Sequence, residues 1–467
     1  MLHINIISLS TIQTEGRLDP KYFRFNEKRE DLIHNSSINF HKIGDEYVTK
    51  KVTDGEHQAI NLFKKGEKGA DIRYLYVHNI KEGIVDLTDS LYINKDIHEK
   101  RLKRSQLKKG NVLLTIVGTI GKSAMVYDYL GEANIPRNIS KIVVNEENIY
   151  PEFLTAFFLS QFGREQSFYS SGGNLQGLLS LTKLKNMFTP IPDKKTQEKI
   201  GKIYLEALEL ETESLNLIQS AIDYFYQKLG IDFDKFLKEK YYDTDVSDLE
   251  SSDFWCPIYR YPMYLKIEEK IKSKWKTKKI GKIFDIKKGN EVGSSNYNNF
   301  IFKEKDQIPF VRTSDIVNYE IDQDPDFFIP KEIYEDLNQD IKPGDILFTN
   351  DGKIGEVSII TDTDKCIIQS HIKRLRLKDE EELDPFYIFL PLIIPEIGGY
   401  QSNRFTVIQS TIPTISNRIE NISIPILNKK DMEHISGLVR EAFELKDQKK
   451  TLFKKLKKDM DILLGYP

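Results

Sequence analysis

The sequence predicts an α+β protein built from two copies of one mixed α/β domain and two long helices. Three observations lead to this prediction: an internal repeat, short strand-like runs inside each copy, and a long charged segment after each copy. The chain has 467 residues, which exceeds the size at which single hydrophobic cores stop growing. Its composition, 39% hydrophobic and 11% aromatic, is that of a folded protein. At least two domains are therefore expected.

The internal repeat is clearest around three glycines. Residues 107–122 (LKKGNVLLTIVGTIGK) return as residues 341–356 (IKPGDILFTNDGKIGE), and all three glycines keep one offset of 234 residues. Two further matches, 72–80 with 308–316 and 184–190 with 419–425, keep nearly the same offset. Such a series predicts duplicated domains related by pseudo-twofold symmetry.

Within each copy, short apolar runs alternate with Gly, Asn and Asp, which is typical of strands and turns. Val112–Val117 and Ile346–Thr349 are predicted strands. Pro151–Phe162 and Pro385–Leu392 are predicted helices, because proline suits the first helical turn.

Each copy is followed by a segment with apolar residues at heptad spacing, over 204–229 and 435–463. Both stripes extend over roughly four heptads, which favours long helices that pair as a coiled coil. Glu211 interrupts the first stripe and Lys449 the second. If the helices run antiparallel, these two residues would meet in one ion pair. The predicted boundaries are 1–192 for the first domain, 193–245 for the central helix and spacer, 246–427 for the second domain, and 428–467 for the C-terminal helix.

Charge and cysteine content exclude several classes of protein. Lys and Arg number 68 against 71 Asp and Glu, so no net positive charge indicates a nucleic-acid partner. Two cysteines cannot build a disulfide framework or a cysteine-based zinc site. No signal-peptide pattern opens the chain and no apolar run approaches the roughly 20 residues that span a bilayer. A cytoplasmic location is expected.

Two motifs imitate catalytic sites. Residues 118–123 (GTIGKS) end like a phosphate-binding loop, but the required earlier glycine is replaced by Ile116. Asp345, Asp351 and Lys353 imitate a metal-dependent nuclease, yet the first copy lacks all three at the matching positions. A glycine turn is the favoured interpretation of both. The sequence therefore predicts no catalytic centre and no bound metal or cofactor, and a stand-alone nuclease stays as a minor alternative.

Polar side chains gather in the turn regions of both copies. Arg, Asn, Gln and His can hydrogen-bond base edges, while Lys, Ser and Thr suit phosphates. The matching turns differ in residue type between the copies, as expected of two domains with one fold and different targets. The candidate DNA-binding residues are His57, Gln58, Lys122, Arg137, Asn138, Lys141, Asn174 and Gln176 in the first copy, and Arg312, Thr313, Lys353, Gln369, His371, Lys373 and Arg404 in the second.

In these segments the chain resembles the specificity subunit of type I restriction-modification systems. The resemblance is carried by 54–57, 72–83, 109–122 and 190–192, and in the second copy by 308–316, 343–355 and 425 onward. It implies two target recognition domains that each bind one half of a split double-stranded DNA sequence, with the long helices setting the spacing. It also implies a non-catalytic chain that assembles with methyltransferase subunits carrying S-adenosylmethionine, and optionally with an endonuclease and translocase subunit. The specificity chain of a related type II system and a repeat-built protein-interaction scaffold without a DNA role remain alternatives.

Overall fold

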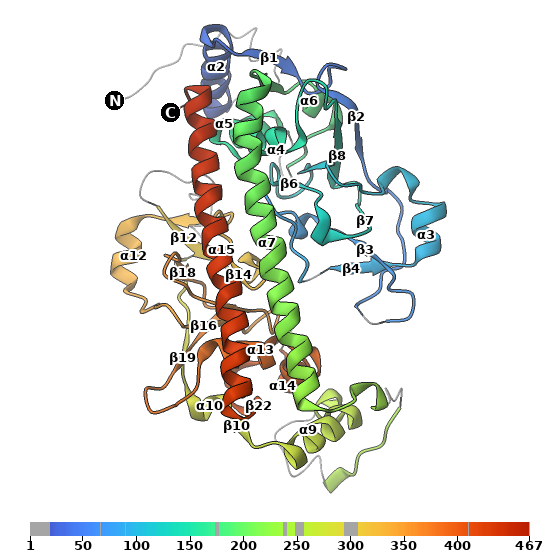
Figure 1. Ribbon diagram of the computed structural model, residues 1–467, viewed down its shortest axis with the longest axis vertical. Helices are drawn as coiled ribbons and strands as arrows, with labels where there is room; N and C mark the ends of the chain where they lie inside the picture. The colour runs from blue at the N-terminus through green and yellow to red at the C-terminus, as the bar shows by residue number, and fades with distance from the viewer. Residues whose placement is uncertain are drawn as a thin grey trace. The chain divides into compact units, whose positions relative to one another are not determined.

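The computed structural model describes residues 19–65, 67–88, 90–172, 177–236, 241–247, 256–293, 307–409 and 411–466 (Figure 1). The chain divides into two compact units. Unit 1 comprises Met1–Glu209 and Thr451–Pro467, and unit 2 comprises Leu210–Lys450. Both contain helices and sheets, so the predicted mixed composition is confirmed.

Unit 1 is organised around a four-stranded antiparallel sheet of order β2-β8-β5-β6. A three-stranded sheet of order β4-β3-β7 and the pair β1-β9 complete its strands. The strands are β1 (Asn39–Lys42), β2 (Thr49–Asp54), β3 (Ile72–Tyr74), β4 (Leu91–Ile93), β5 (Val112–Thr115), β6 (Ser123–Met125), β7 (Ala133–Asn134), β8 (Ile139–Val144) and β9 (Phe188–Ile191). The helices are α2 (Pro20–Asn35), α3 (Lys95–Lys100), α4 (Pro151–Leu159), α5 (Gln161–Ser170), α6 (Leu181–Lys185) and the first part of α7 (Lys194–Leu229).

Helix α4 forms the centre of the unit 1 core. All of its residues except Glu152 are buried, and it packs against β5, β6 and β9. The predicted helix over Pro151–Phe162 is in fact two helices. The side chain of Ser160 accepts a hydrogen bond from the backbone of Gly163 at 3.1 Å, which caps the start of α5 and ends α4 at Leu159.

Unit 2 repeats these sheet orders. Its four-stranded sheet is β11-β19-β16-β17 and its three-stranded sheet is β15-β12-β18, with three further strand pairs, β10-β22, β13-β14 and β20-β21. The strands are β10 (Thr277–Lys279), β11 (Phe284–Lys288), β12 (Ile308–Val311), β13 (Ile316–Val317), β14 (Glu320–Ile321), β15 (Phe328–Ile329), β16 (Ile346–Thr349), β17 (Val357–Ile359), β18 (Ile367–Ile368), β19 (Ile372–Leu377), β20 (Val407–Gln409), β21 (Ile412–Thr414) and β22 (Ser423–Pro425). The helices are α9 (Pro262–Lys274), α10 (Ile280–Ile283), α12 (Lys331–Leu337), α13 (Pro385–Ile393), α14 (Tyr400–Phe405) and most of α15 (Lys429–Leu464).

Internal hydrogen bonds also recur at the repeat offset. In unit 1 the Gln166 side chain donates to the backbone oxygen of Phe188 at 2.8 Å and accepts from its nitrogen at 2.9 Å. In unit 2 Gln401 makes the same two bonds to Ser423, at 2.8 and 2.7 Å. Each glutamine ties a helix to the last strand of its unit, and neither residue lies within the glycine-rich segments that reveal the repeat in the sequence.

The long helices α7 and α15 contact each other within unit 2. The Tyr224 ring makes an edge-to-face contact with the His434 ring, with centroids 4.4 Å apart, while the Glu211 carboxylate lies 2.5 Å from the Lys449 amine. The earlier residue of α7 meets the later residue of α15, so these segments are antiparallel. The predicted ion pair between Glu211 and Lys449 is confirmed. Helix α7 ends at Leu229, well before residue 245, because Gly230 adopts the left-handed conformation (φ +59°) that terminates helices.

Gly398 is expected to be essential for the fold of unit 2. A Cβ at Gly398 would lie 2.1 Å from the carbonyl oxygen of Leu392 in α13, whereas a Cβ at the adjacent Gly399 would meet nothing closer than 3.8 Å. G398A should therefore force a backbone shift and destabilise unit 2 by about 3 kcal/mol. G399A is the matched control and should change stability little. Urea denaturation of both variants measures the difference, and equal midpoints would contradict the expectation.

Across the described ranges no helix combines the length and the apolar composition that crossing a bilayer requires.

Candidate nucleic-acid interface

Each unit presents a glycine turn that is hydrogen-bonded to a segment later in the same unit, which in unit 2 is the hairpin β20–β21. In unit 2 the turn follows β16, and Gly352 donates its backbone N–H to the oxygen of Pro413 in β21 at 2.9 Å. In unit 1 the turn follows β5, and Gly118 donates to Gly177 at 3.2 Å. Gly118 and Gly352 both have positive φ, +83° and +73°, which explains why glycine stands at this place in both copies.

Asp351 links this turn to the hairpin in unit 2. Its carboxylate contacts the Nδ1 atom of His371 at 2.9 Å, accepts a hydrogen bond from the Asn350 amide at 2.7 Å, and accepts another from the Thr414 hydroxyl. Burial alone would raise the pKa of Asp351, but these three hydrogen bonds outweigh burial and lower it. Asp351 therefore stays ionised and fixes both His371, which is 42% exposed, and the base of β21.

Lys373 proves to be a structural residue at the base of the same hairpin. Its buried amine donates to the carbonyl oxygen of Ser416 at 2.8 Å and to the side-chain oxygen of Asn417 at 3.3 Å. Burial lowers the pKa of Lys373. The sequence placed Lys373 on an open DNA-binding surface; the structure instead places it behind that surface, where it holds the chain that follows β21.

In unit 1 the structure brings His57 and Gln58 together with two arginines. The His57 Nε2 atom lies 2.8 Å from the Asp54 carboxylate, which also accepts a hydrogen bond from Arg104 at 2.8 Å. Arg101 donates to the side-chain oxygen of Gln58 at 2.9 Å. Sequence reasoning missed both arginines, although the basic run KRLKR over 100–104 was a visible signal.

Arg137 and Asn138 lie beside this group. The backbone N–H of Arg137 donates to the oxygen of Glu56 at 2.9 Å, and its side chain is exposed. Asn138 is half-buried and its backbone oxygen accepts from Ile116 at 2.9 Å. Asp54–Gln58, Arg101, Arg104, Arg137 and Asn138 thus form one polar surface of unit 1.

Lys141 is not on that surface. Its amine donates to the carbonyl oxygens of Arg104 at 2.6 Å and Gln106 at 2.8 Å, and burial lowers its pKa to about 8. Arg374 occupies the equivalent position in the strand register of the unit 2 sheet. It donates a hydrogen bond to the backbone oxygen of Asp340 at 3.3 Å, and Asp340 corresponds to Gln106 in the repeat. In both units, then, this cation ties the loop before the sheet strand to the sheet itself.

Lys122 is likewise interior, 3.2 Å from Glu82 in an ion pair whose two side chains are less than a tenth exposed. The ion pair with Glu82 accounts for the lysine in the sequence 118–123, which resembles the end of a phosphate-binding loop, and no bound nucleotide is needed to explain it. Asn174 and Gln176 lie outside the described residues.

The other unit 2 candidates have mixed surroundings. Arg312 pairs with Asp315 at 3.4 Å and Asp326 at 3.0 Å, and its guanidinium lies 4.1 Å from the ring centroid of Phe327. Lys353 is 28% exposed and lies 3.3 Å from a Glu356 oxygen. Thr313 and Gln369 are half-buried near these groups, since the backbone of Gln369 donates to the residue before Arg312.

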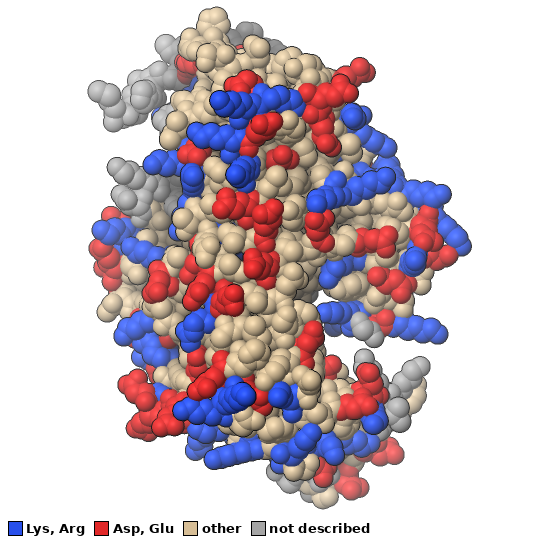
Figure 2. All heavy atoms as spheres, in the orientation of Figure 1, with Lys and Arg blue, Asp and Glu red and all other residues tan. Residues whose placement is uncertain are grey.

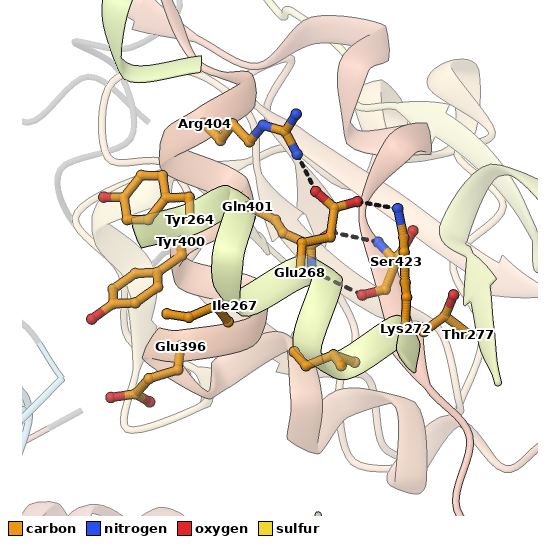
Figure 3. A pocket seen from close by; sticks show the side chains of 11 residues that line it. Tyr264, Ile267, Glu268, Lys272, Thr277, Glu396, Tyr400, Gln401, Arg404 and Ser423 are labelled. Atoms are coloured by element: carbon orange, nitrogen blue, oxygen red, sulfur yellow. Dashed lines mark hydrogen bonds and ion pairs between the residues drawn. The ribbon is translucent and has the colours of Figure 1, made fainter. Parts of the chain in front are cut away.

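Arg404 lies in a different part of unit 2, in the wall of a cavity of about 10 Å³ (Figure 3). Its guanidinium pairs with Glu268, donates to the carbonyl oxygen of Tyr259 at 2.8 Å and stacks 4.5 Å from that ring. The cavity has room for about one water molecule. These contacts join α14 to α9, so the structure assigns Arg404 a packing role in place of the predicted DNA contact.

The nuclease-like residues do not converge. Asp345 accepts from Arg376 at 2.7 and 2.8 Å, whereas Asp351 is engaged with His371 and Thr414. Among the residues with described positions, no group of three His, Cys, Asp or Glu side chains could hold a metal ion. The nuclease alternative gains no support.

Basic and acidic side chains alternate on the face drawn in Figure 2. This pattern matches the near-zero net charge and places no broad positive field on that face. DNA contact by this chain would therefore depend on local groups of residues such as those described above.

Comparison with known proteins shows similarity to one family in part of the chain. Residues 272–454 match the family model of the type I restriction modification DNA specificity domain. The type I restriction enzyme EcoBI specificity subunit of Escherichia coli is 33% identical over 129 residues, so the match covers 28% of this chain and 27% of that relative. The type I restriction-modification S subunit from M. genitalium aligns over 92% of this chain and 96% of its own, with 15% identity and a TM-score of 0.30. The HsdS subunit from Thermoanaerobacter tengcongensis aligns over the same shares, with 15% identity and a TM-score of 0.28. Residues 272–454 are thus similar to type I restriction modification DNA specificity domains, and the chain spans about a quarter of the length of the curated relative that it matches.

Proposed function

We propose that this chain is the DNA specificity subunit of a type I restriction-modification system, in which each unit binds one half of a split target. The family match of residues 272–454 carries the proposal. That match falls almost wholly within unit 2, so the same role for unit 1 is inferred from the repeat.

The recurring scaffold supports two DNA-binding units. Both units have the same sheet orders, a glutamine that ties a helix to the last strand, and a glycine turn bonded to a later segment of the unit. The residues that face each other at this turn differ: Val117 and Leu178 in unit 1, Asp351 and Thr414 in unit 2. A shared framework with different side chains at the exposed turns is the arrangement expected of two units with different half-sites.

The remaining parts of the proposal concern partners. The chain itself is proposed to be non-catalytic and to dock methyltransferase subunits that bind S-adenosylmethionine, with an endonuclease and translocase subunit as an optional addition. Helices α7 and α15 would set the distance between half-sites. Because the chain has no net positive charge, we expect weak DNA binding alone and tight, salt-sensitive binding by the complex. A specificity chain of a related type II system is the second candidate.

Mapping of DNA methylation tests the proposal. The chain is co-expressed with an adenine methyltransferase that lacks its own recognition domain, in a host free of DNA methylation, and modified adenines are mapped by single-molecule sequencing. The methyltransferase is sought in the gene next to that of this chain. A split motif with a fixed spacer is the expected result. A complex that co-purifies in soluble form but modifies no site would contradict the proposed role.

A further inference from the structure

The hairpin β20–β21 in unit 2 exposes two large apolar side chains. Ile408 is 74% exposed and Ile412 is 52% exposed. Single exposed isoleucines are ordinary, but here two lie on one short two-stranded ribbon. This ribbon leaves the unit next to the glycine turn that carries Asp351.

The strand register shows which isoleucine faces away from the protein. Val407 is opposite Thr414 and Ile408 is opposite Pro413, so these pairs lie on opposite faces of the ribbon. The Thr414 side chain donates a hydrogen bond to Asp351, so the face of the ribbon that carries Thr414 is turned towards the body of unit 2. Ile412 shares the Thr414 face. Ile408 is therefore on the outward face.

The base of the ribbon is firmly held. Lys373 binds the carbonyl oxygen of Ser416 at 2.8 Å, and Arg418 donates to the oxygen of Thr414 at 3.3 Å and to that of Phe405 at 2.9 Å. Ser416 has φ +49°, a left-handed conformation that a serine adopts only where its surroundings enforce it. These bonds fix the direction in which the ribbon leaves the unit, and a fixed direction suits recognition of a rigid partner.

We propose that β20–β21 enters the major groove of the half-site bound by unit 2, with Ile408 in contact with a thymine methyl group. This inference rests on the proposed function. The major groove admits a two-stranded ribbon, and the C5-methyl of thymine is the apolar group that base pairs present there. An outward aliphatic side chain cannot bind a phosphate, whereas the neighbouring Lys353 and His371 can supply polar contacts.

Deoxyuridine scanning tests the contact, because deoxyuridine lacks only that methyl group. Thymines of the mapped target are replaced one at a time, and binding of the complex with its methyltransferase is measured by fluorescence anisotropy at one salt concentration. We expect one position at which deoxyuridine weakens binding about fourfold. I408A should bind thymine and deoxyuridine at that position equally well. I412A, on the inward face of the same ribbon, should keep the fourfold difference.

Three results would overturn the inference. Specific binding that no deoxyuridine substitution weakens would exclude the methyl contact and leave the proposed function intact. The same holds if I408A keeps the thymine preference. Absence of any sequence-specific binding to the unmodified target would instead remove the proposed function and the inference together. Two controls show that I408A is folded: its thermal transition is unchanged, and its methylation still depends on the sequence of the other half-site.

Discussion

Replacing Glu211 with glutamine is expected to destabilise unit 2 by about 3–5 kcal/mol. Glu211 has no solvent exposure, and its carboxylate lies 3.2 Å from the Lys446 amine and 2.5 Å from the Lys449 amine. The Asn318 amide donates to it at 2.7 Å. Burial alone would raise the pKa of Glu211, but the two lysines outweigh burial and hold it at about 2. Glutamine keeps the shape and removes the charge, so two buried ammonium groups lose a counter-ion.

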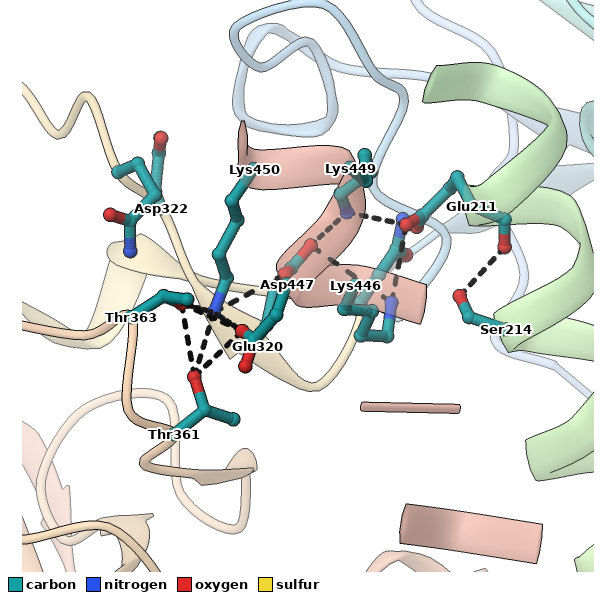
Figure 4. Close-up of polar contacts among 12 residues, drawn as sticks. Glu211, Ser214, Glu320, Asp322, Thr361, Thr363, Lys446, Asp447, Lys449 and Lys450 are labelled. Atoms are coloured by element: carbon teal, nitrogen blue, oxygen red, sulfur yellow. Dashed lines mark hydrogen bonds and ion pairs between the residues drawn. The ribbon is translucent and has the colours of Figure 1, made fainter. Parts of the chain in front are cut away.

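The surrounding network makes this loss hard to absorb (Figure 4). Lys449 also pairs with Glu320, and Lys446 lies 3.9 Å from the same carboxylate. Lys450 also lies 3.8 Å from Glu320, and it pairs with Asp364 at 2.9 Å and Asp447 at 3.1 Å. Glu320 would remain as the partner of both Lys446 and Lys449, and water cannot reach either amine.

Tryptophan fluorescence measures this effect within unit 2. The chain has two tryptophans, Trp255 and Trp275, and both belong to unit 2. The Trp275 ring nitrogen donates to the oxygen of Leu229 at 3.1 Å, at the end of the helix that carries Glu211. E211Q should lower the urea midpoint of the fluorescence transition. E213Q, an exposed position on the same helix, is the matched control and should not.

A compensating change separates charge from packing. K449M removes one of the cations that E211Q leaves behind, so the double variant E211Q/K449M should recover part of the lost stability. If E211Q and E213Q unfold at the same urea concentration, the buried carboxylate contributes nothing and the expectation is wrong.

Only part of this network could be predicted from sequence. Glu211 and Lys449 each interrupt an apolar heptad stripe, and two such interruptions on helices that pair indicate an ion pair. Asn318 and Glu320 gave no comparable signal, because they come from the tight β13–β14 turn, in which Asn318 and Tyr319 both have positive φ. Periodicity describes the face of one helix, and it carries no information about a loop that packs against that face from elsewhere in the chain.

The candidate interface shows the same division. The repeated glycines predicted where the turns lie, because only glycine tolerates the backbone at Gly118 and Gly352. The lysines were less informative. Lysine is a residue type that commonly contacts phosphates, yet the amines of Lys141 and Lys373 donate hydrogen bonds to backbone carbonyl oxygens inside the protein. Residue type alone does not distinguish an exposed lysine from one that fastens a loop, whereas the hydrogen-bond partners in the fold do.

Replacing Glu82 with glutamine is expected to destabilise unit 1, again by about 3–5 kcal/mol. The Glu82 side chain is 5% exposed, and its carboxylate lies 3.2 Å from Lys122, 3.7 Å from Arg164 and 3.9 Å from Lys457. Burial alone would raise the pKa of Glu82, but Arg164, Lys122 and Lys457 outweigh it and hold the pKa at about 2. This one carboxylate thus joins the glycine turn, α5 and the last part of α15, and its loss removes an anion that faces three cations.

The pH dependence of unit 1 stability distinguishes a charge effect from a packing effect. A carboxyl whose pKa falls from 4.5 to about 2 on folding contributes stability that is complete above pH 4.5 and disappears as the pH falls towards 2. The difference between E82Q and the unaltered chain should therefore be largest near neutral pH and shrink between pH 4.5 and 2. Hydrogen exchange of the β5 and β6 amides reports on unit 1, with E99Q, an exposed position in α3, as the control. A difference that stays constant over this pH range would show that the glutamine acts through packing alone, since a charge effect requires an ionised Glu82.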